Sequence, residues 1–217
     1  MAVTGLRERK KLQTRQAIAR SAATLFAQRG YERVAVLDVA RAANVSEQTV
    51  YNYFPTKERL VLDRDEEFEL RLAGLVRERP PGASPAGALR AEALALLDGM
   101  ESIPARDARG GLAYIAAVSP AVRRLCLEMT DRHADAIAQA IVETSGGSEG
   151  EGEGEGGCNR QLAKVQAVAL AWVFQAIIDH AGRALLTGQA PAQIAAALRP
   201  EIERTFDSLD SWLQDAS

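Results

Sequence analysis

The sequence is poor in the residues on which catalytic and metal sites depend. Among 217 residues it has 2 cysteines, 2 histidines and 5% aromatics. Cys126 and Cys158 lie far apart in the chain, so they predict no zinc site, and we expect two free thiols in a reducing compartment. No glycine-rich phosphate loop, Gly-x-Ser-x-Gly or His-Glu-x-x-His motif occurs. We therefore expect no catalytic residue, no metal ligand, no cofactor and no enzymatic activity.

Long apolar runs are also missing. No run reaches the roughly 18 residues that a membrane span needs, and no apolar segment of a secretion signal follows Met1. We expect a cytoplasmic protein without a membrane partner. A chain of this length can bury a substantial core, arranged as one small domain and one larger one.

Positive charge is concentrated at one end of the chain. Residues 1–62 hold 11 Lys and Arg against 5 Asp and Glu, whereas residues 63–217 hold 15 against 24. The overall pI near 5.6 argues against nucleic-acid binding. Salt, however, screens the electric field of each charge beyond about 8 Å, so the local charge of a surface and not the overall pI determines whether it can bind DNA. The basic end, with Arg7-Glu8-Arg9-Lys10-Lys11 as an arm, is expected to meet DNA along its backbone or in the minor groove.

Residues 14–62 have the pattern of three short helices and the start of a fourth. Thr14 is the expected N-cap of the first helix, and Gly30 is expected to end it. The chain must turn sharply between the second and third helices. Asn44 stands at this turn and suits it, because Asn tolerates a left-handed backbone. Ser46 then caps a third helix, which ends before Pro55. The second and third helices have the spacing of a helix-turn-helix.

The third helix is expected to turn Val50 and Phe54 inward and a polar face outward. Gln48 and Asn52, one turn apart, suit adenine edges, and Glu47 suits a cytosine amino group. The tyrosines, threonine and lysine suit phosphate oxygens. The predicted DNA-binding residues are Ser46, Glu47, Gln48, Thr49, Tyr51, Asn52, Tyr53 and Lys57. The alternative is an ordinary solvated helix surface in a fold that binds no nucleic acid.

The stretch from "LFAQRGYE" through "LDVARAANVS" to "TVYNYFPTKERLV" resembles the N-terminal domain of the tetracycline-repressor (TetR) family. The resemblance implies a homodimeric bacterial repressor that binds a palindromic operator and is released when its C-terminal domain binds a small molecule. By position, Gln48, Thr49 and Asn52 correspond to the family's recognition face. Tyr51, Tyr53 and Lys57 correspond to its usual phosphate contacts.

Two positions depart from the family pattern. Val34-Ala35 stand where the family has a Thr or Ser that caps the second helix and meets a phosphate. The missing cap is worth about 1 kcal/mol, and the corresponding phosphate contact is in doubt. Asn44 stands where the family usually has Gly.

The predicted fold class is all-α. An N-terminal three-helix helix-turn-helix DNA-binding domain (1–62) precedes a helical ligand-binding and dimerisation domain (63–217), with about nine to ten helices in all. A fourth helix is expected to run from 57 to about 79, followed by helices near 86–100, 105–117, 120–143 and 191–199. The Gly/Glu segment 145–157 is expected to be a linker; a metal site made of its glutamates is the alternative.

Two apolar segments, at about 160–187 and 201–214, predict the homodimer interface. The first is apolar on nearly every face, so it needs cover on two sides. The second follows Pro200, which is expected to separate it from the helix at 191–199. The alternative is that both segments belong to the core of a monomer.

The expected effector is a small amphipathic molecule. The candidate ligand-binding residues are Arg71, Met100, Tyr114, Met129, His133, Trp172, Gln175 and His180. Structural roles compete, because histidine and methionine also occur as ordinary core residues. Two other hypotheses stay open: a DNA-binding protein of the same fold that a protein partner controls without an effector, and an enzyme or carrier with incidental N-terminal helices.

Overall fold

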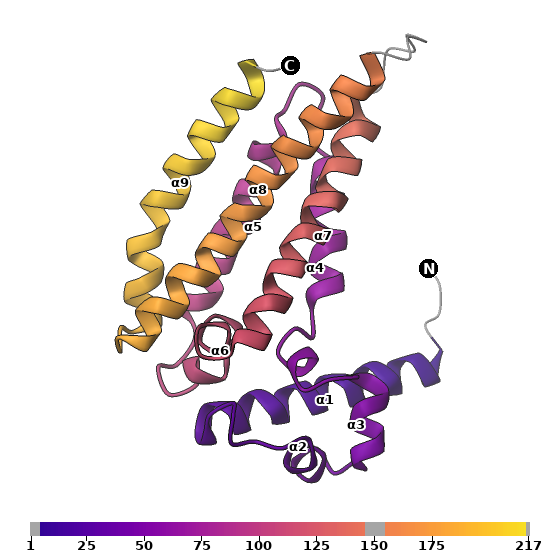
Figure 1. Ribbon diagram of the computed structural model, residues 1–217, viewed down its shortest axis with the longest axis vertical. Coiled ribbons are helices and arrows are strands. Elements are labelled where there is room, and N and C mark those ends of the chain that lie inside the picture. Colours follow the sequence, from indigo (N-terminus) through magenta and orange to yellow (C-terminus); the bar gives the residue numbers. More distant parts are fainter. Residues whose placement is uncertain (1–4, 146–154, 216–217) are drawn as a thin grey trace.

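The computed structural model describes residues 5–145 and 155–215, and every regular element in these ranges is helical (Figure 1). In chain order the elements are α1 (Leu6–Arg29), α2 (Val36–Ala42), α3 (Glu47–Tyr53), the 3-10 helix η1 (Glu58–Leu60), α4 (Asp65–Arg77), α5 (Pro85–Glu101), the 3-10 helix η2 (Ala108–Gly110), α6 (Leu112–Val118), α7 (Pro120–Ser145), α8 (Glu155–Leu186) and α9 (Pro191–Asp215). The predicted all-α fold is confirmed.

Helices α1, α2 and α3 form a small unit at one end of the molecule (Figure 1). Ile18 and Phe26 of α1 are buried against Val39 of α2. Val50 and Phe54 at α3 point into the same core, as the sequence predicts. Burying such a side chain contributes about 1.5–3 kcal/mol, so these contacts fix the orientation of the short α3.

The N-terminal core does not end at α3. Ile115 of α6 and Val122, Cys126 and Met129 of α7 are buried in the same cluster. The close approach of η2 to α1 adds to this contact, because Gly110 has no side chain. A Cβ atom at Gly110 would lie 2.2 Å from the Ala23 carbonyl oxygen of α1. The small unit is therefore packed directly onto α6 and α7.

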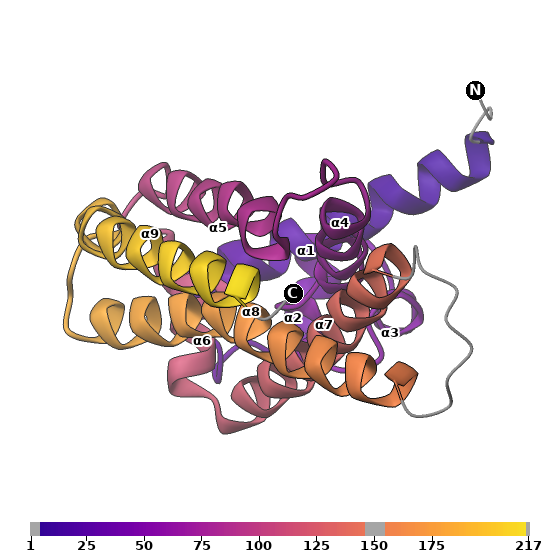
Figure 2. The ribbon, with the colours of Figure 1, turned by 90° about the horizontal axis from the view of Figure 1, so that it is seen from above.

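The larger core lies between helices α4, α5, α7, α8 and α9. Figure 2 shows the arrangement of these helices from above. Helix α7 packs on α8, α5 on α9, and α4 on α7. Each contributes buried side chains, among them Leu72, Leu89, Ile137, Phe174 and Phe206. Helix α6 crosses α8 closely, since a Cβ at Gly182 would lie 2.4 Å from the Ala113 carbonyl oxygen. The body is thus a helical bundle, and it holds α6 against the N-terminal unit.

The first helix is longer than predicted. It begins at Leu6, with Gly5 as its N-cap, and Thr14 is an interior residue whose Oγ1 donates to the Lys10 carbonyl at 3.0 Å. The N-cap prediction for Thr14 was wrong, because Arg, Lys, Gln and Leu all have high helix propensity and extend the helix backwards. The predicted basic arm is therefore helical, and its exposed turns project beyond the body (Figure 2).

The predicted continuous helix from 57 to 79 is wrong. The 3-10 helix η1 ends at Leu60, and α4 begins only at Asp65. Leu60 and Leu62 are both buried in the N-terminal core, although residues two apart lie about 200° apart around an α-helix. A continuous helix would expose one of them, so the backbone breaks. Arg15 stabilises the break by donating from Nε to Asp63 Oδ1 at 2.7 Å and from Nη2 to the Asp63 carbonyl at 3.0 Å.

The predicted break at Pro200 is also wrong, because α9 runs through it. Ile194, Leu198, Ile202 and Phe206 follow at steps of four residues on both sides of the proline, and all four are buried. An interior proline costs about 3 kcal/mol, which is less than the combined burial of these side chains contributes. The helix predicted at 105–117 is shorter in the structure: Gly110 and Gly111 precede α6, which begins at Leu112.

The predicted Gly/Glu linker lies largely outside the described residues. At its edges, Ser145 ends α7 and Glu155 begins α8. Residues Arg160–Leu186 of α8 are long and apolar enough to cross a membrane by length and composition alone. Half of the most apolar window, 50%, is buried inside the protein, as in the core helix of a folded bundle.

Candidate nucleic-acid interface

The turn between α2 and α3 depends on one asparagine. Asn44 has a φ of 56°, the only positive φ of a non-glycine residue in the described part of the chain. This confirms the predicted sharp turn, since Asn is the side chain that best tolerates the left-handed region. The Val45 amide then donates to the Ala40 carbonyl at 3.0 Å. The second helix is thereby closed, and the third starts two residues after the turn.

The N-terminus of α3 is capped as predicted. Ser46 Oγ accepts the Thr49 amide at 3.0 Å and lies 2.7 Å from Thr49 Oγ1. The two hydroxyls are therefore fixed against each other at the start of the helix. Such a cap stabilises a helix by about 1 kcal/mol, which matters for a helix of only seven residues.

The N-terminus of α2 lacks a side-chain cap, as the sequence indicates. Ala35 is the N-cap residue and has no side-chain acceptor. Asp38 compensates in part, because its Oδ2 accepts the Ala35 amide at 2.9 Å. The same carboxylate lies 4.0 Å from Arg29 Nη1 at the end of α1. The start of α2 is therefore held by an acidic residue in its first turn and offers no hydroxyl to a phosphate.

The outward face of α3 carries the predicted base-reading side chains. Glu47, Gln48, Tyr51 and Asn52 are all exposed. Gln48 Nε2 donates to Asn52 Oδ1 at 3.1 Å, so the two amides lie side by side, one turn apart. The Gln48 oxygen and the Asn52 nitrogen remain available as one acceptor and one donor, which are the groups that an adenine edge requires.

Two predicted contact residues lie apart from this face. Tyr53 is half-buried against the N-terminal core. Lys57 Nζ lies 4.2 Å from the centre of the Tyr31 ring and 3.4 Å from the Glu32 carbonyl oxygen. The Lys57 ammonium therefore rests on the connection between α1 and α2, at the edge of the surface and not on α3 itself.

A buried carboxylate joins this unit to the body. The Asp65 side chain at the start of α4 contacts a histidine and two arginines: its Oδ1 lies 3.1 Å from His133 Nε2, its Oδ2 accepts from Arg132, and Arg59 Nη1 lies 3.7 Å from Oδ2. Burial alone would raise the pKa of the Asp65 carboxyl. The hydrogen bond from His133 and the charge of Arg132 outweigh burial and hold this pKa below its usual value of 3.8. Asp65 belongs to a run of three acidic residues, and nothing in the sequence predicts that it is the one that is buried.

The Asp65 network makes stability depend on acid pH. Because the pKa is lowered by folding, the ionised carboxylate stabilises the fold fully above pH 3.8, and this contribution is lost as the pH falls below that value. We expect Asp65→Asn to lower the free energy of unfolding at pH 7 by about 2 kcal/mol, since the arginines keep some exposure. Urea titrations from pH 7 to pH 2.5 measure this. The variant should lose less stability on acidification than the wild type, and parallel curves would contradict the assignment.

The eight candidate ligand-binding residues do not meet at one cavity. Met129, His133 and Gln175 are buried in packed interior, and Gln175 Oε1 accepts from Thr130 Oγ1 at 3.0 Å. Arg71 and Trp172 are exposed, and Arg71 lies 3.6 Å from Glu92. The remaining three, Met100, Tyr114 and His180, are half-buried.

The two best-formed cavities of the described residues have other linings. One, of about 580 Å³, lies where the ends of α4, α7 and α9 meet the α4–α5 loop. The other, of about 470 Å³, lies between η1 and the start of α7 and is lined by Thr56, Glu58, Arg59, Ala121, Arg124 and Leu125. None of the eight candidates lines either cavity. The spacing of residues in the sequence could not predict these two cavities, because the residues that line each one come from distant parts of the chain.

The capped turn, the outward face of α3 and the bundle behind them define a helix-turn-helix protein. Residues 18–63 match the model of the family described as "Bacterial regulatory proteins, tetR family". The HTH-type transcriptional regulator TcmR of Streptomyces glaucescens is 34% identical over 91 residues, which cover 40% of this chain and 40% of TcmR. The N-terminal part of the chain is thus similar to the tetR family of bacterial regulatory proteins, and the match spans less than half the length of TcmR.

Solved structures agree on the fold over nearly the whole chain. FadR of Bacillus subtilis, solved in complex with stearoyl-CoA, has a TM-score of 0.53 at 15% identity and covers 90% of this chain and 97% of its own. NalD of Pseudomonas aeruginosa, a secondary repressor of the MexAB-OprM multidrug efflux pump, has a TM-score of 0.52 at 17% identity, with coverages of 90% and 97%. At these identities the likeness establishes the fold alone.

Proposed function

We propose that the protein is a transcription regulator that acts as a homodimeric repressor, binds a palindromic operator through α3 of each subunit and is released by a small amphipathic effector. The observation that carries the proposal is the exposed Gln48–Asn52 amide pair on a helix anchored by buried Val50 and Phe54. This face belongs to the basic part of the chain, which supplies the sequence-independent attraction to phosphate.

Exposed apolar side chains on α8 and α9 support a homodimer through the segments at about 160–187 and 201–214. Val165 and Trp172 are 56% and 45% exposed and lie two turns apart on one face of α8. Trp212 on α9 is 39% exposed. Large apolar side chains left exposed in the single chain are typical of a surface that another subunit covers. Two-fold symmetry would place two copies of α3 on successive major grooves.

The effector is the part of the proposal that separates it from control by a protein partner alone. A regulator without an effector needs no cavity in its body, whereas the described residues of the body line an open groove of about 580 Å³. The similar FadR was solved with stearoyl-CoA, an amphipathic molecule. Both observations favour the effector-controlled form.

The proposed mechanism is a population shift between two spacings of the recognition helices. Helix α4 connects the body to the N-terminal unit, and the break between η1 and α4 is where their relative orientation can change. An effector that binds the released state about 100-fold better shifts the equilibrium by about 2.7 kcal/mol. Such a shift is enough to release an operator bound with moderate affinity.

The experiment that tests the function is selection of bound fragments from random duplex DNA, followed by anisotropy titration of the selected site at two salt concentrations. We expect a palindromic site bound by two subunits. Failure to enrich any sequence, with only weak and salt-sensitive binding, would contradict the proposal for protein purified free of small molecules.

Alanine variants separate base contacts from phosphate contacts. We expect Gln48→Ala or Asn52→Ala to cost about 1–3 kcal/mol on the selected site and to relax specificity at one base pair. Lys57→Ala should weaken binding to all sequences alike and reduce the salt dependence. The measurement is the ratio of affinities for selected and random duplexes. Equal losses on both duplexes for Gln48→Ala would show that Gln48 does not contact a base.

A further inference from the structure

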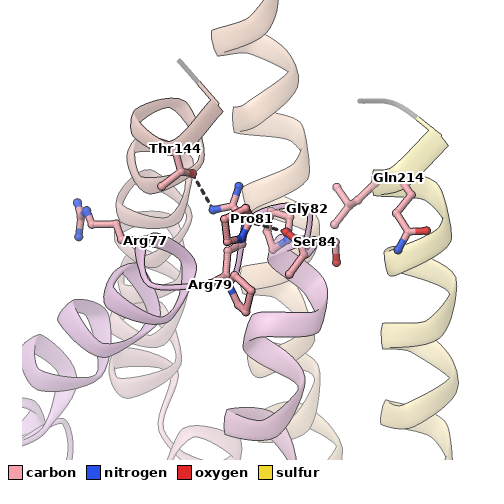
Figure 3. A pocket seen from close by; sticks show the side chains of 11 residues that line it. Arg77, Arg79, Pro81, Gly82, Ser84, Thr144 and Gln214 are labelled. Carbon is pink, nitrogen blue, oxygen red and sulfur yellow. Dashed lines mark hydrogen bonds between the residues drawn. The ribbon is translucent and has the colours of Figure 1, made fainter. Parts of the chain in front are cut away.

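The cavity of about 580 Å³ is a groove at the end of the bundle remote from α3 (Figures 1 and 3). Its walls are the C-terminal ends of α4, α7 and α9 and the loop that joins α4 to α5. The lining residues are Arg77, Arg79, Pro80, Pro81, Gly82, Ala83, Ser84, Pro85, Thr144, Leu213 and Gln214. Among the described residues, two arginines and no acidic residue line it.

Arg79 is the central cation of the groove. Its Nε donates to the Ala83 carbonyl at 2.9 Å, and its Nη1 donates to the Val76 carbonyl at 2.5 Å and to Thr144 Oγ1 at 2.6 Å (Figure 3). All three acceptors are neutral, and within residues 5–145 and 155–215 no carboxylate forms an ion pair with Arg79. Burial lowers the pKa of the Arg79 guanidinium, which nevertheless remains charged at neutral pH because arginine is a very strong base.

The other polar groups of the groove already have partners. Arg77 points away from it (Figure 3), and its Nε donates to Glu143 Oε2 at 2.6 Å. Ser84 Oγ donates to Asp210 Oδ1, and Gln214 Nε2 donates to Asp210 Oδ2 at 3.1 Å. The Asp210 carboxylate is thus satisfied from two sides. Arg79 Nη2 is left as the donor that no acceptor of the described residues occupies.

A guanidinium that pairs with no carboxylate of the described residues and is fixed in place by neutral acceptors is prepared for an anion. Its orientation is set before any ligand arrives, so little side-chain entropy is lost on binding. Pro80, Pro81, Pro85 and Leu213 supply apolar wall beside it. A ligand that combines one anionic group with a short apolar part can therefore satisfy both kinds of surface.

We propose that this groove is a binding site for a small amphipathic carboxylate or sulfonate, whose anionic group accepts from Arg79 and whose apolar part lies against the proline-rich loop and Leu213. That the groove binds such a ligand does not depend on the proposed function. That the ligand is the effector does rest on the proposed function. Its position suits that role, since a ligand there would link the end of α4 to the ends of α7 and α9.

Fluorescence titration with anilinonaphthalene sulfonate, on the full-length protein without DNA, tests the site. Phenylnaphthylamine, which has the same aromatic part without the charge, is the matched probe. We expect octanoate to displace the sulfonate and octanol of the same chain length not to do so. Arg79→Gln should weaken sulfonate binding about tenfold, the effect of one lost charged hydrogen bond, and leave phenylnaphthylamine binding unchanged.

A second variant keeps the test valid if Arg79→Gln perturbs the loop. Gln214→Glu places a negative charge on the groove wall and should weaken sulfonate binding about fivefold. Gln189→Glu makes the same change in the exposed loop that precedes α9, at the opposite end of that helix from Gln214, and should have no effect. Sulfonate affinity that is equal in wild type, folded Arg79→Gln and Gln214→Glu would overturn the proposal. Because DNA is absent, a failure of operator binding does not affect this outcome.

Discussion

Gly110→Ala is expected to lower the free energy of unfolding by about 3 kcal/mol. The added Cβ would lie 2.2 Å from the Ala23 carbonyl oxygen and 3.1 Å from the Ala27 Cβ. Backbone cannot yield as a flexible side chain can, so η2 must move away from α1. Urea denaturation measures the change, and the operator affinity should fall as well, because η2 helps to position α1.

Gly182→Ala provides a second example of the same effect. Its Cβ would lie 2.4 Å from the Ala113 carbonyl oxygen of α6, and we expect a loss of about 2–3 kcal/mol. Gly99→Ala in α5 is the control, since nothing lies within 4 Å of its added methyl group. This variant should be more stable than wild type by about 0.5–1 kcal/mol, as an alanine in a helix is. If all three variants had the same stability, the close helix crossings would be refuted.

Trp172→Glu is expected to raise the dimer dissociation constant by about 100-fold or more. The indole is exposed on α8 in the single chain, so a charge there does not disturb the protomer core. In the proposed dimer it would be a central apolar contact, whose loss costs about 2–4 kcal/mol, and the buried carboxylate adds to that cost. Sedimentation velocity over a concentration series measures the dissociation constant.

Operator binding should follow the loss of the dimer. A monomer contacts one half-site, so the variant should bind the full palindrome only at concentrations that restore the dimer. Leu70→Glu is the control: Leu70 is 72% exposed on α4, away from α8 and α9. It should leave both the dimer and the operator affinity unchanged. A Trp172→Glu protein that stays dimeric at nanomolar concentration would exclude this face as the interface.

The features predicted correctly are those that short-range physics decides. Ser46 caps α3, Asn44 adopts the left-handed turn, and Val50 and Phe54 point inward because residues four apart share a helix face. These relations lie within about ten residues, so the pattern of side chains determines them. The outward face of α3, with Gln48 and Asn52, follows from the same period. The base contacts themselves stay a prediction.

The features missed depend on segments far apart in the chain. Pro200 continues a helix because residues on both sides of it pack on α5, which no local rule contains. Asp65 is buried, whereas its neighbours Glu66 and Glu67 are exposed. Which of the three carboxylates is buried depends on packing against α7, which lies more than 50 residues later in the chain. The groove around Arg79 is assembled from three helix ends more than 60 residues apart, so no local pattern in the sequence predicts it, and the eight candidate ligand-binding residues stay a prediction.

The shared packing of Ile115, Val122, Cys126 and Met129 with the helix-turn-helix unit limits how far this protein is modular. A fragment that ends at residue 62 would expose the surface that these side chains cover. It would also lose Gly110, which packs closely against the Ala23 carbonyl. Exchange of N-terminal units between relatives would therefore succeed only if α6 and the start of α7 were exchanged with them. The segment that recognises DNA and the helices that support it have to vary together.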